Sequence, residues 1–133
     1  MLSIVLVDDN KADAHLVIEL IKDTGIEHEI VCFSNGEQAL KFFETNDGVD
    51  LILLDLHIPK VSGKDIMSFL KERGKGRSAS VVVMTGTAAP QDINDAKELG
   101  ATCVLVKPMT SEEMDRVTSE LKEILLGRRN CNC

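Results

Sequence analysis

Aromatic residues are scarce in this sequence: it has no Trp and no Tyr, and its four Phe are the whole aromatic content. A hydrophobic core must therefore be built mainly from aliphatic side chains. Long apolar runs are missing too, since none approaches the roughly 20 residues that a helix needs to span a bilayer. The N-terminal stretch MLSIVLVDD has neither the basic flank nor the cleavage site of a signal peptide. We therefore expect no contact with a membrane and a cytoplasmic location.

An excess of positive charge is also missing. The formal net charge is −7, and the one basic cluster, KERGKGR at 71–77, is short. A broad basic face is what direct binding to nucleic acid or anionic lipid requires, so we expect neither partner. What the chain does have is 133 residues, of which 44% are hydrophobic. That is enough for one domain with its own core, and we place this domain at residues 1–127.

The sequence has four Cys: Cys32, Cys103, Cys131 and Cys133. In a cytoplasmic protein we expect them to be reduced. Cys32 and Cys103 lie in apolar runs, where packing in the core is expected. Cys131 and Cys133 lie in a segment, 128–133, that we expect to be a disordered tail. Two thiols cannot close a zinc site within one chain, although metal binding or disulfide formation by this tail stays open.

Short apolar runs alternate with segments whose apolar residues recur at helical spacing. We expect strands at 3–8, 28–33, 50–55, 80–86 and 102–108, each followed by a helix. Such alternation predicts an α/β fold, with a parallel sheet covered by helices on both faces. Three helices carry start signals. Ser34 with Glu37, and Thr110 with Glu113, have the spacing of a capping box, and Pro90 suits a first helical turn.

Charged or hydroxyl residues stand at the ends of four of the five predicted strands. They are Asp8 and Asp9 after the first strand, Asp55 at the end of the third, Thr85 at the end of the fourth and Lys107 at the end of the fifth. In an open α/β sheet, ligands bind outside the carboxyl ends of the strands, so these groups should meet at one edge. Carboxylates that are brought together repel each other and need cations. Lys107 and a hard divalent ion such as Mg²⁺ would supply them.

This arrangement predicts phosphoryl-transfer chemistry. Asp55 can act as a carboxylate nucleophile that attacks phosphorus and forms an aspartyl phosphate. Asp8 and Asp9, together with Asp55, would hold the Mg²⁺, and the backbone carbonyl of His57 is a plausible further ligand.

The phosphoryl oxygens need partners of their own. Lys107 and the metal would neutralise the charge that spreads over these oxygens during transfer. Thr85 would donate its hydroxyl to a phosphoryl oxygen, and Gly86 would leave room for the attached group.

On these residues the sequence resembles the receiver domains of two-component response regulators. The matching motifs are VDDN at 7–10, LLDLHIPKVSG at 53–63, MTG at 84–86 and VKP at 106–108. The resemblance implies a flavodoxin-like fold with a doubly wound, five-stranded parallel sheet in the order 2-1-3-4-5.

For the site, the resemblance implies that Asp55 is the phosphoacceptor, Asp8 and Asp9 the acid pair, Thr85 the switch hydroxyl and Lys107 the phosphate-contacting lysine. It also implies a cis bond before Pro108. The implied phosphoryl donor is a histidine kinase or a histidine phosphotransfer protein. The protein would be an enzyme only in catalysing its own phosphorylation and dephosphorylation.

The resemblance also implies a signalling output. Phosphorylation would shift an equilibrium between two conformations of the fourth helix and fifth strand, and that face would then contact a protein partner. The last helix and the 90–106 face could equally support a homodimer.

The sequence departs from the family pattern at two positions. Val104 stands where receivers often have Tyr or Phe as the second half of the switch, so an aromatic readout is excluded there. Ser62 replaces a common Asp before the turn glycine, a change that we expect to be harmless. His57 and Thr87 each lie two residues past a site residue, and they could influence how long the phosphoryl group persists. For His57 an exposed loop position without a role stays equally open.

Three other functions compete with this one. A phosphatase of the aspartyl-phosphate type would need a second Asp where His57 stands. A flavodoxin-like cofactor binder would need amides and hydroxyls, not the carboxylates of DDNKAD at 8–13, to face a phosphate. A receiver that binds partners without phosphorylation is kept open by Val104. The chain would act alone, as a shuttle in a phosphorelay, or as one domain of a larger regulator.

Overall fold

The computed structural model describes residues 2–46, 48–56, 63–73, 80–86, 89–107 and 110–126. Within these ranges the elements alternate strictly between strand and helix. Their bounds are β1 Leu2–Val7, α1 Lys11–Asp23, β2 His28–Phe33, α2 Gly36–Thr45, β3 Leu51–Asp55, α3 Gly63–Arg73, β4 Ser80–Thr85, α4 Pro90–Glu98, β5 Cys103–Val106 and α5 Ser111–Leu125. All strand pairs are parallel, and the order is β2-β1-β3-β4-β5. The predicted fold class and strand order are confirmed.

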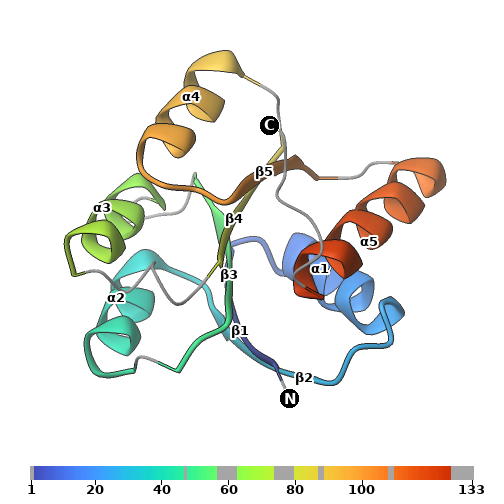
Figure 1. Ribbon diagram of the computed structural model, residues 1–133, viewed down its shortest axis with the longest axis horizontal. Coiled ribbons are helices and arrows are strands. Elements are labelled where there is room, and N and C mark those ends of the chain that lie inside the picture. Colours follow the sequence, from blue (N-terminus) through green and yellow to red (C-terminus); the bar gives the residue numbers. More distant parts are fainter. Residues whose placement is uncertain are drawn as a thin grey trace.

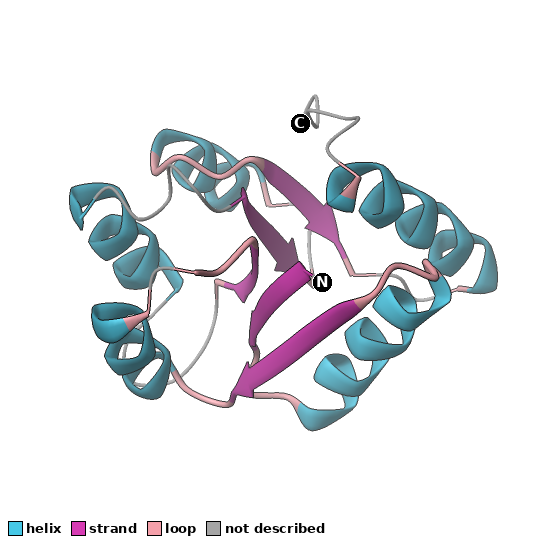
Figure 2. Cartoon of the chain, turned by 60° about the horizontal axis from the view of Figure 1, so that its bottom comes forward, coloured by secondary structure: helices cyan, strands magenta, loops and turns pink. Residues whose placement is uncertain are grey.

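The sheet separates two layers of helices, as Figures 1 and 2 show. α1 and α5 cover one face, and α2, α3 and α4 cover the other (Figure 1). Successive residues of a strand point to opposite faces. In β1, for example, Ile4 joins the cluster with α1 and α5, whereas Val5 joins the cluster with the other three helices. This explains the continuous apolar runs of the central strands, because both of their faces are buried.

The edge strand β2 differs from the central strands. Each of its residues is either half-buried or exposed, and Val31 keeps 42% of its surface exposed. The expectation that Cys32 packs in the core is therefore wrong: the residue is exposed and its thiol is free. The apolar run alone did not reveal that this strand would have a neighbour on one side only.

The other described cysteine is buried as expected, with Cys103 only 1% exposed. It is disulfide-bonded, however, so the expectation that all the thiols are reduced is wrong for this one. Reasoning from the redox compartment does not consider which thiols a fold brings together.

The helix starts follow the predicted chemistry with one shift. The Thr110 side chain accepts from the Glu113 N–H, and Pro90 begins α4, as predicted. For α2 the cap is Asn35, whose side chain accepts from the Gln38 N–H, so the choice of Ser34 was wrong by one residue. Both residue types are good N-caps, and side-chain preference alone could not choose between neighbours.

α3 and α4 are linked by polar contacts across their exposed sides. The Lys64 Nζ lies 2.8 Å from Asp95 Oδ2 and 3.5 Å from Asp92 Oδ1. The hydrogen bond to Asp95 raises the pKa of Lys64, so this ammonium is charged at neutral pH. The Lys71 Nζ donates to the carbonyl of Glu98 at the other end of α4. These contacts tie α4 to a helix that begins directly beneath the end of β3.

None of the helices in the described ranges is both long enough and apolar enough to cross a lipid bilayer. His57, Ser62, Thr87, Pro108 and the segment 128–133 lie outside the described residues. The roles expected for His57 and Thr87, the bond before Pro108, and the domain end at 127 with its tail therefore stay predictions.

Candidate functional site

The carboxyl ends of the strands bring the predicted acidic residues together. Asp8 directly follows β1, and Asp55 is the last residue of β3, the strand beside it in the sheet. One oxygen each of Asp8, Asp9 and Asp55 lie within 4.8 Å of one another. Asp8 is buried, Asp55 is half-buried and Asp9 is exposed. Three converging carboxylate oxygens that are open to solvent on one side fit a hard divalent cation that keeps some of its waters.

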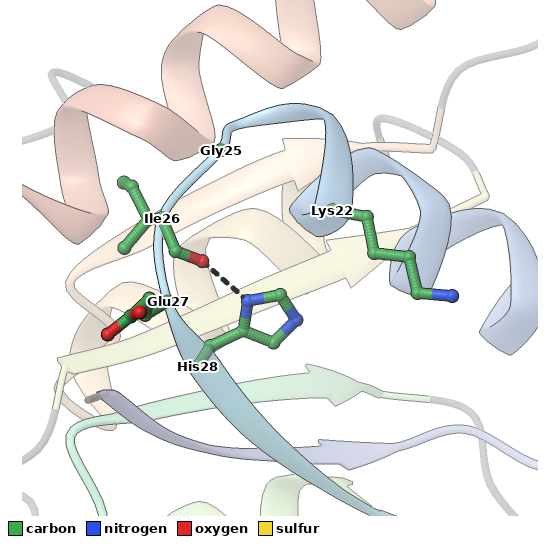
Figure 3. A pocket seen from close by; sticks show the side chains of 5 residues that line it. All are labelled: Lys22, Gly25, Ile26, Glu27 and His28. Carbon is green, nitrogen blue, oxygen red and sulfur yellow. Dashed lines mark hydrogen bonds between the residues drawn. The ribbon is translucent and has the colours of Figure 1, made fainter.

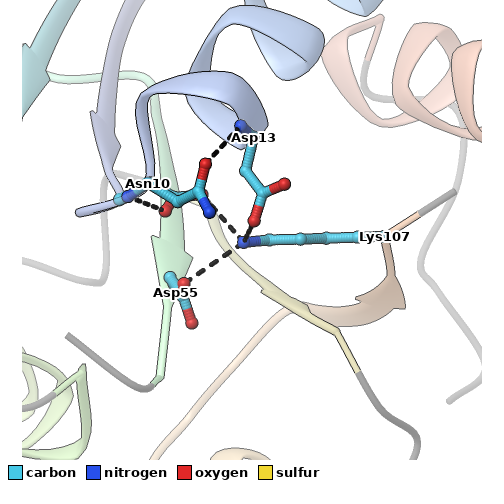
Figure 4. Close-up of polar contacts among 5 residues, drawn as sticks. Asn10, Asp13, Asp55 and Lys107 are labelled. Atoms are coloured by element: carbon cyan, nitrogen blue, oxygen red, sulfur yellow. Dashed lines mark hydrogen bonds and ion pairs between the residues drawn. The ribbon is translucent and has the colours of Figure 1, made fainter. Parts of the chain in front are cut away.

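Lys107, directly after β5, brings a positive charge to this edge. Its Nζ lies 2.8 Å from Asp8 Oδ2, 3.0 Å from Asp13 Oδ2 and 3.2 Å from Asp55 Oδ2. Figure 4 shows the lysine side chain reaching toward Asp13 and Asp55. Its backbone N–H donates to the carbonyl of Thr85 at 2.8 Å, which fixes the end of β5 against the end of β4. The predicted meeting of Asp55 and Lys107 is present in the structure.

The charges of this group are strongly coupled. Partial burial lowers the pKa of Lys107, but the hydrogen bonds to Asp8 and Asp13 and the charge of Asp55 raise it more. Its pKa therefore lies above its ordinary value, and the ammonium is charged at neutral pH.

At Asp8 the balance is reversed. Burial raises the pKa of this carboxyl, and the hydrogen bonds from Lys107 and from the Asn10 N–H only partly oppose that rise. Any further cation that approaches Asp8 would therefore stabilise its charged form.

Asp13 belongs to this group and was missed by the sequence analysis. It occupies the first turn of α1, and its backbone N–H donates to the Asn10 side chain, which caps the helix (Figure 4). The signal that could have found it is its position, because helical side chains point toward the N-terminus of their helix. The N-terminus of α1 faces the carboxyl edge of the sheet, so an acid in its first turn is directed toward the site.

Thr85 ends β4 with only 1% of its surface exposed. Gly86 follows it, and a Cβ added there would meet none of the described residues within 4 Å. The described residues thus leave open the space next to the strand end that the sequence analysis expected at Gly86.

Gly63 has the opposite surroundings. A Cβ at this position would lie 2.6 Å from the carbonyl oxygen of Asp55 and 2.7 Å from the Cα of Leu56. The Gly63 N–H also donates to the Leu56 carbonyl at 3.1 Å. The start of α3 is thus pressed against the backbone that carries Asp55, and only glycine permits this approach.

Val104 occupies the position where a receiver often has an aromatic residue. It lies in β5 opposite Val83 of β4, and it is half-buried against the core cluster beneath α2, α3 and α4. Two residues on, Val106 keeps 38% of its surface exposed.

A separate hollow of about 360 Å³ is lined by Lys22, Gly25, Ile26, Glu27 and His28 (Figure 3). It lies at the start of β2, where the amino ends of the strands are, and includes none of the site residues above. The ring Nδ1 of His28 is 2.7 Å from the carbonyl oxygen of Ile26, which accounts for this nitrogen. The hollow is therefore separate from the acidic edge.

The doubly wound parallel sheet and its acidic edge with a lysine together define the class of this protein. Residues 4–118 match the response regulator receiver domain family, and the chain belongs to that family. It is a receiver domain of the two-component response regulators.

Individual relatives extend the match over most of the chain. The probable methanogenesis regulatory protein FilR2 of Methanothrix harundinacea is 32% identical, over 93% of this chain and 83% of that protein. The response regulator Rcp1 of Synechocystis sp. is 30% identical, over 92% of this chain and 88% of that protein.

Two solved structures are similar throughout. A receiver domain from Rhodospirillum rubrum gives a TM-score of 0.83 at 28% identity, covering 97% of this chain and 96% of that one. The Mn²⁺-bound form of Rcp1 gives 0.82 at 29% identity, covering 95% of both chains.

Proposed function

We propose that this protein receives a phosphoryl group on Asp55 from the phosphohistidine of a histidine kinase or a histidine phosphotransfer protein. The observation that carries the proposal is the position of the Asp55 carboxylate, which lies close to the carboxylates of Asp8 and Asp9 and 3.2 Å from the Lys107 ammonium. A carboxylate in contact with an ammonium and a cation site is suited to attack a phosphoryl group, since the negative charges of nucleophile and donor are both compensated.

Asp8, Asp9 and Asp55 would hold Mg²⁺, with the backbone carbonyl of His57 as a further ligand. When bound, the ion supplies neutralisation of the charge on the transferring phosphoryl oxygens. The Mn²⁺-bound structure of the relative Rcp1 supports a divalent ion at this edge.

The transfer itself forms one bond and breaks another. The Asp55 carboxylate attacks phosphorus, the P–N bond breaks, and its electron pair returns to the imidazole of the donor. Lys107 would donate to one phosphoryl oxygen and Thr85 to another, while Gly86 leaves the space open. Water later attacks the same phosphorus and releases inorganic phosphate, and His57 and Thr87 would influence the rate of that step.

The signal would leave through α4, β5 and α5. β5 is an edge strand, and Val106 presents an apolar side chain there. We propose that phosphorylation shifts the conformation of this face and so controls a protein partner in the cytoplasm. Since Val104 replaces an aromatic side chain, the shift would pass through the backbone that follows Thr85. A homodimer through the same face is a further prediction, testable by light scattering before and after phosphorylation.

Intact-mass spectrometry after incubation with Mg²⁺ and acetyl phosphate tests the phosphoacceptor. We expect one phosphoryl adduct that hydroxylamine removes, and none in Asp55→Asn. Asp23→Asn, an equivalent change at an exposed position at the end of α1, is the matched control and should behave like wild type. A folded wild type without an adduct, after a phosphorylated kinase has also been tried, would contradict the proposal and leave a binding module that works without phosphorylation.

A further inference from the structure

Lys107 has three ammonium protons, and three carboxylates lie within hydrogen-bond distance of them. Two of these acids, Asp8 and Asp55, also belong to the cluster that can hold a cation. The third, Asp13, does not. Asp13 also lies in none of the motifs by which the sequence resembles a receiver, so its contact with Lys107 has no assigned purpose.

The anchor of Asp13 is independent of the strand ends. Its N–H donates to the Asn10 side chain at 3.0 Å, and this cap fixes the first turn of α1. The Asp13 side chain is 39% exposed, whereas that of Lys107 is 10% exposed. Replacing Asp13 therefore does not leave an unpaired polar group buried at position 13.

The three acids differ in what happens to them during the proposed reaction. Asp8 would turn to the metal, and Asp55 would lose its carboxylate charge when it becomes an acyl phosphate. Asp13 keeps both its charge and its position throughout. It is the contact that can hold the ammonium steady while the other two protons change partners.

We propose that Asp13 is a positioning residue, which holds the Lys107 ammonium where an oxygen of the incoming phosphoryl group meets it. The inference rests on the proposed phosphorylation of Asp55. Without Asp13, the ammonium is paired only with Asp8 and Asp55 and is drawn onto the nucleophile itself. An ammonium held in advance costs no reorganisation during transfer, whereas a displaced one does.

The test is the initial rate of phosphorylation by acetyl phosphate with Mg²⁺, measured by intact mass. Asp13→Ala should be slower by about tenfold, the loss of one positioned charge-assisted contact. Asp13→Glu keeps a carboxylate within reach and should return the rate to within about threefold of wild type. Glu19→Gln removes an exposed charge from the same helix, away from the site, and should leave the rate unchanged.

A second comparison separates positioning from a general loss of charge or fold. If Asp13 acts through the lysine, Asp13→Ala should change the residual rate of Lys107→Ala by no more than about twofold. Circular dichroism melting checks that each variant is folded, and Asp13→Asn replaces Asp13→Ala if the latter is not.

The outcomes are distinct. An adduct on wild type, with Asp13→Ala reacting at the wild-type rate or faster, overturns the positioning role and leaves the phosphoacceptor intact. The positioning role is also overturned if Asp13→Ala lowers the phosphorylation rate by the same factor in wild type and in Lys107→Ala. Absence of any adduct on wild type refutes the phosphorylation of Asp55, and the role of Asp13 with it.

Discussion

The contact between Gly63 and the backbone of Asp55 gives the sharpest prediction about stability. In Gly63→Ala the new Cβ would lie 2.6 Å from the Asp55 carbonyl oxygen and 2.7 Å from the Leu56 Cα. Both are backbone atoms, one in the last residue of β3 and one in the residue that follows it, so neither clash can be relieved by rotating a side chain. Overpacking of this kind costs about 1–3 kcal/mol, and a rigid backbone neighbour places this case near 2–3 kcal/mol. A chain of this size should then melt roughly 6–12 °C lower.

The assay is urea denaturation followed by circular dichroism, together with the phosphorylation rate. Gly86→Ala is the matched control, because a Cβ there meets no atom of the described residues within 4 Å. Its free energy of unfolding should stay within about 1 kcal/mol of wild type. Gly63→Ala should also be phosphorylated more slowly, since relief of the clash moves the backbone of Asp55. Wild-type stability in Gly63→Ala, or an equal loss in Gly86→Ala, would refute the reasoning.

Three further predictions concern charge. With EDTA present, Asp9→Asn should raise the free energy of unfolding by about 0.5–1 kcal/mol by relieving carboxylate repulsion, and the gain should shrink with Mg²⁺. An equal gain in Glu29→Gln, at an exposed position of β2, would contradict this. Lys64→Met should speed amide hydrogen exchange in α4 but not in α1. Lys41→Met, at an exposed position on α2, should leave the exchange in α4 unchanged. Equal protection of α4 in the two variants would count against a link between α3 and α4. The pKa of folded Lys107 lies above its ordinary 10.5, so its stabilisation is complete below that pH and is lost as the pH rises through the folded value. In EDTA, wild type should therefore lose more stability above about pH 10 than Lys107→Met does, and parallel losses would show that the lysine is not responsible.

Most of the fold could be predicted because it depends on local patterns. The apolar runs and helical spacings identified all the described strands and helices, and the carboxyl-edge rule then placed Asp8, Asp55 and Lys107 together. The errors occurred where a tertiary fact decides. Cys32 is exposed because β2 has one neighbour, and no property of the run 28–33 reveals its place in the sheet.

Asp13 illustrates a different limit. The rule that predicted the site considers the residues that end or directly follow each strand, and Asp13 lies six residues beyond the end of β1, one turn into α1. It reaches Lys107 because Asn10 caps the helix and aims its first turn at the same edge. A site at the carboxyl edge of a parallel sheet is therefore built from the first turns of the following helices as well as from the strand ends. In this protein that first turn supplies a partner of the lysine that lies outside the cluster suited to a cation, so one of the three contacts of the ammonium does not involve a group that would hold a metal.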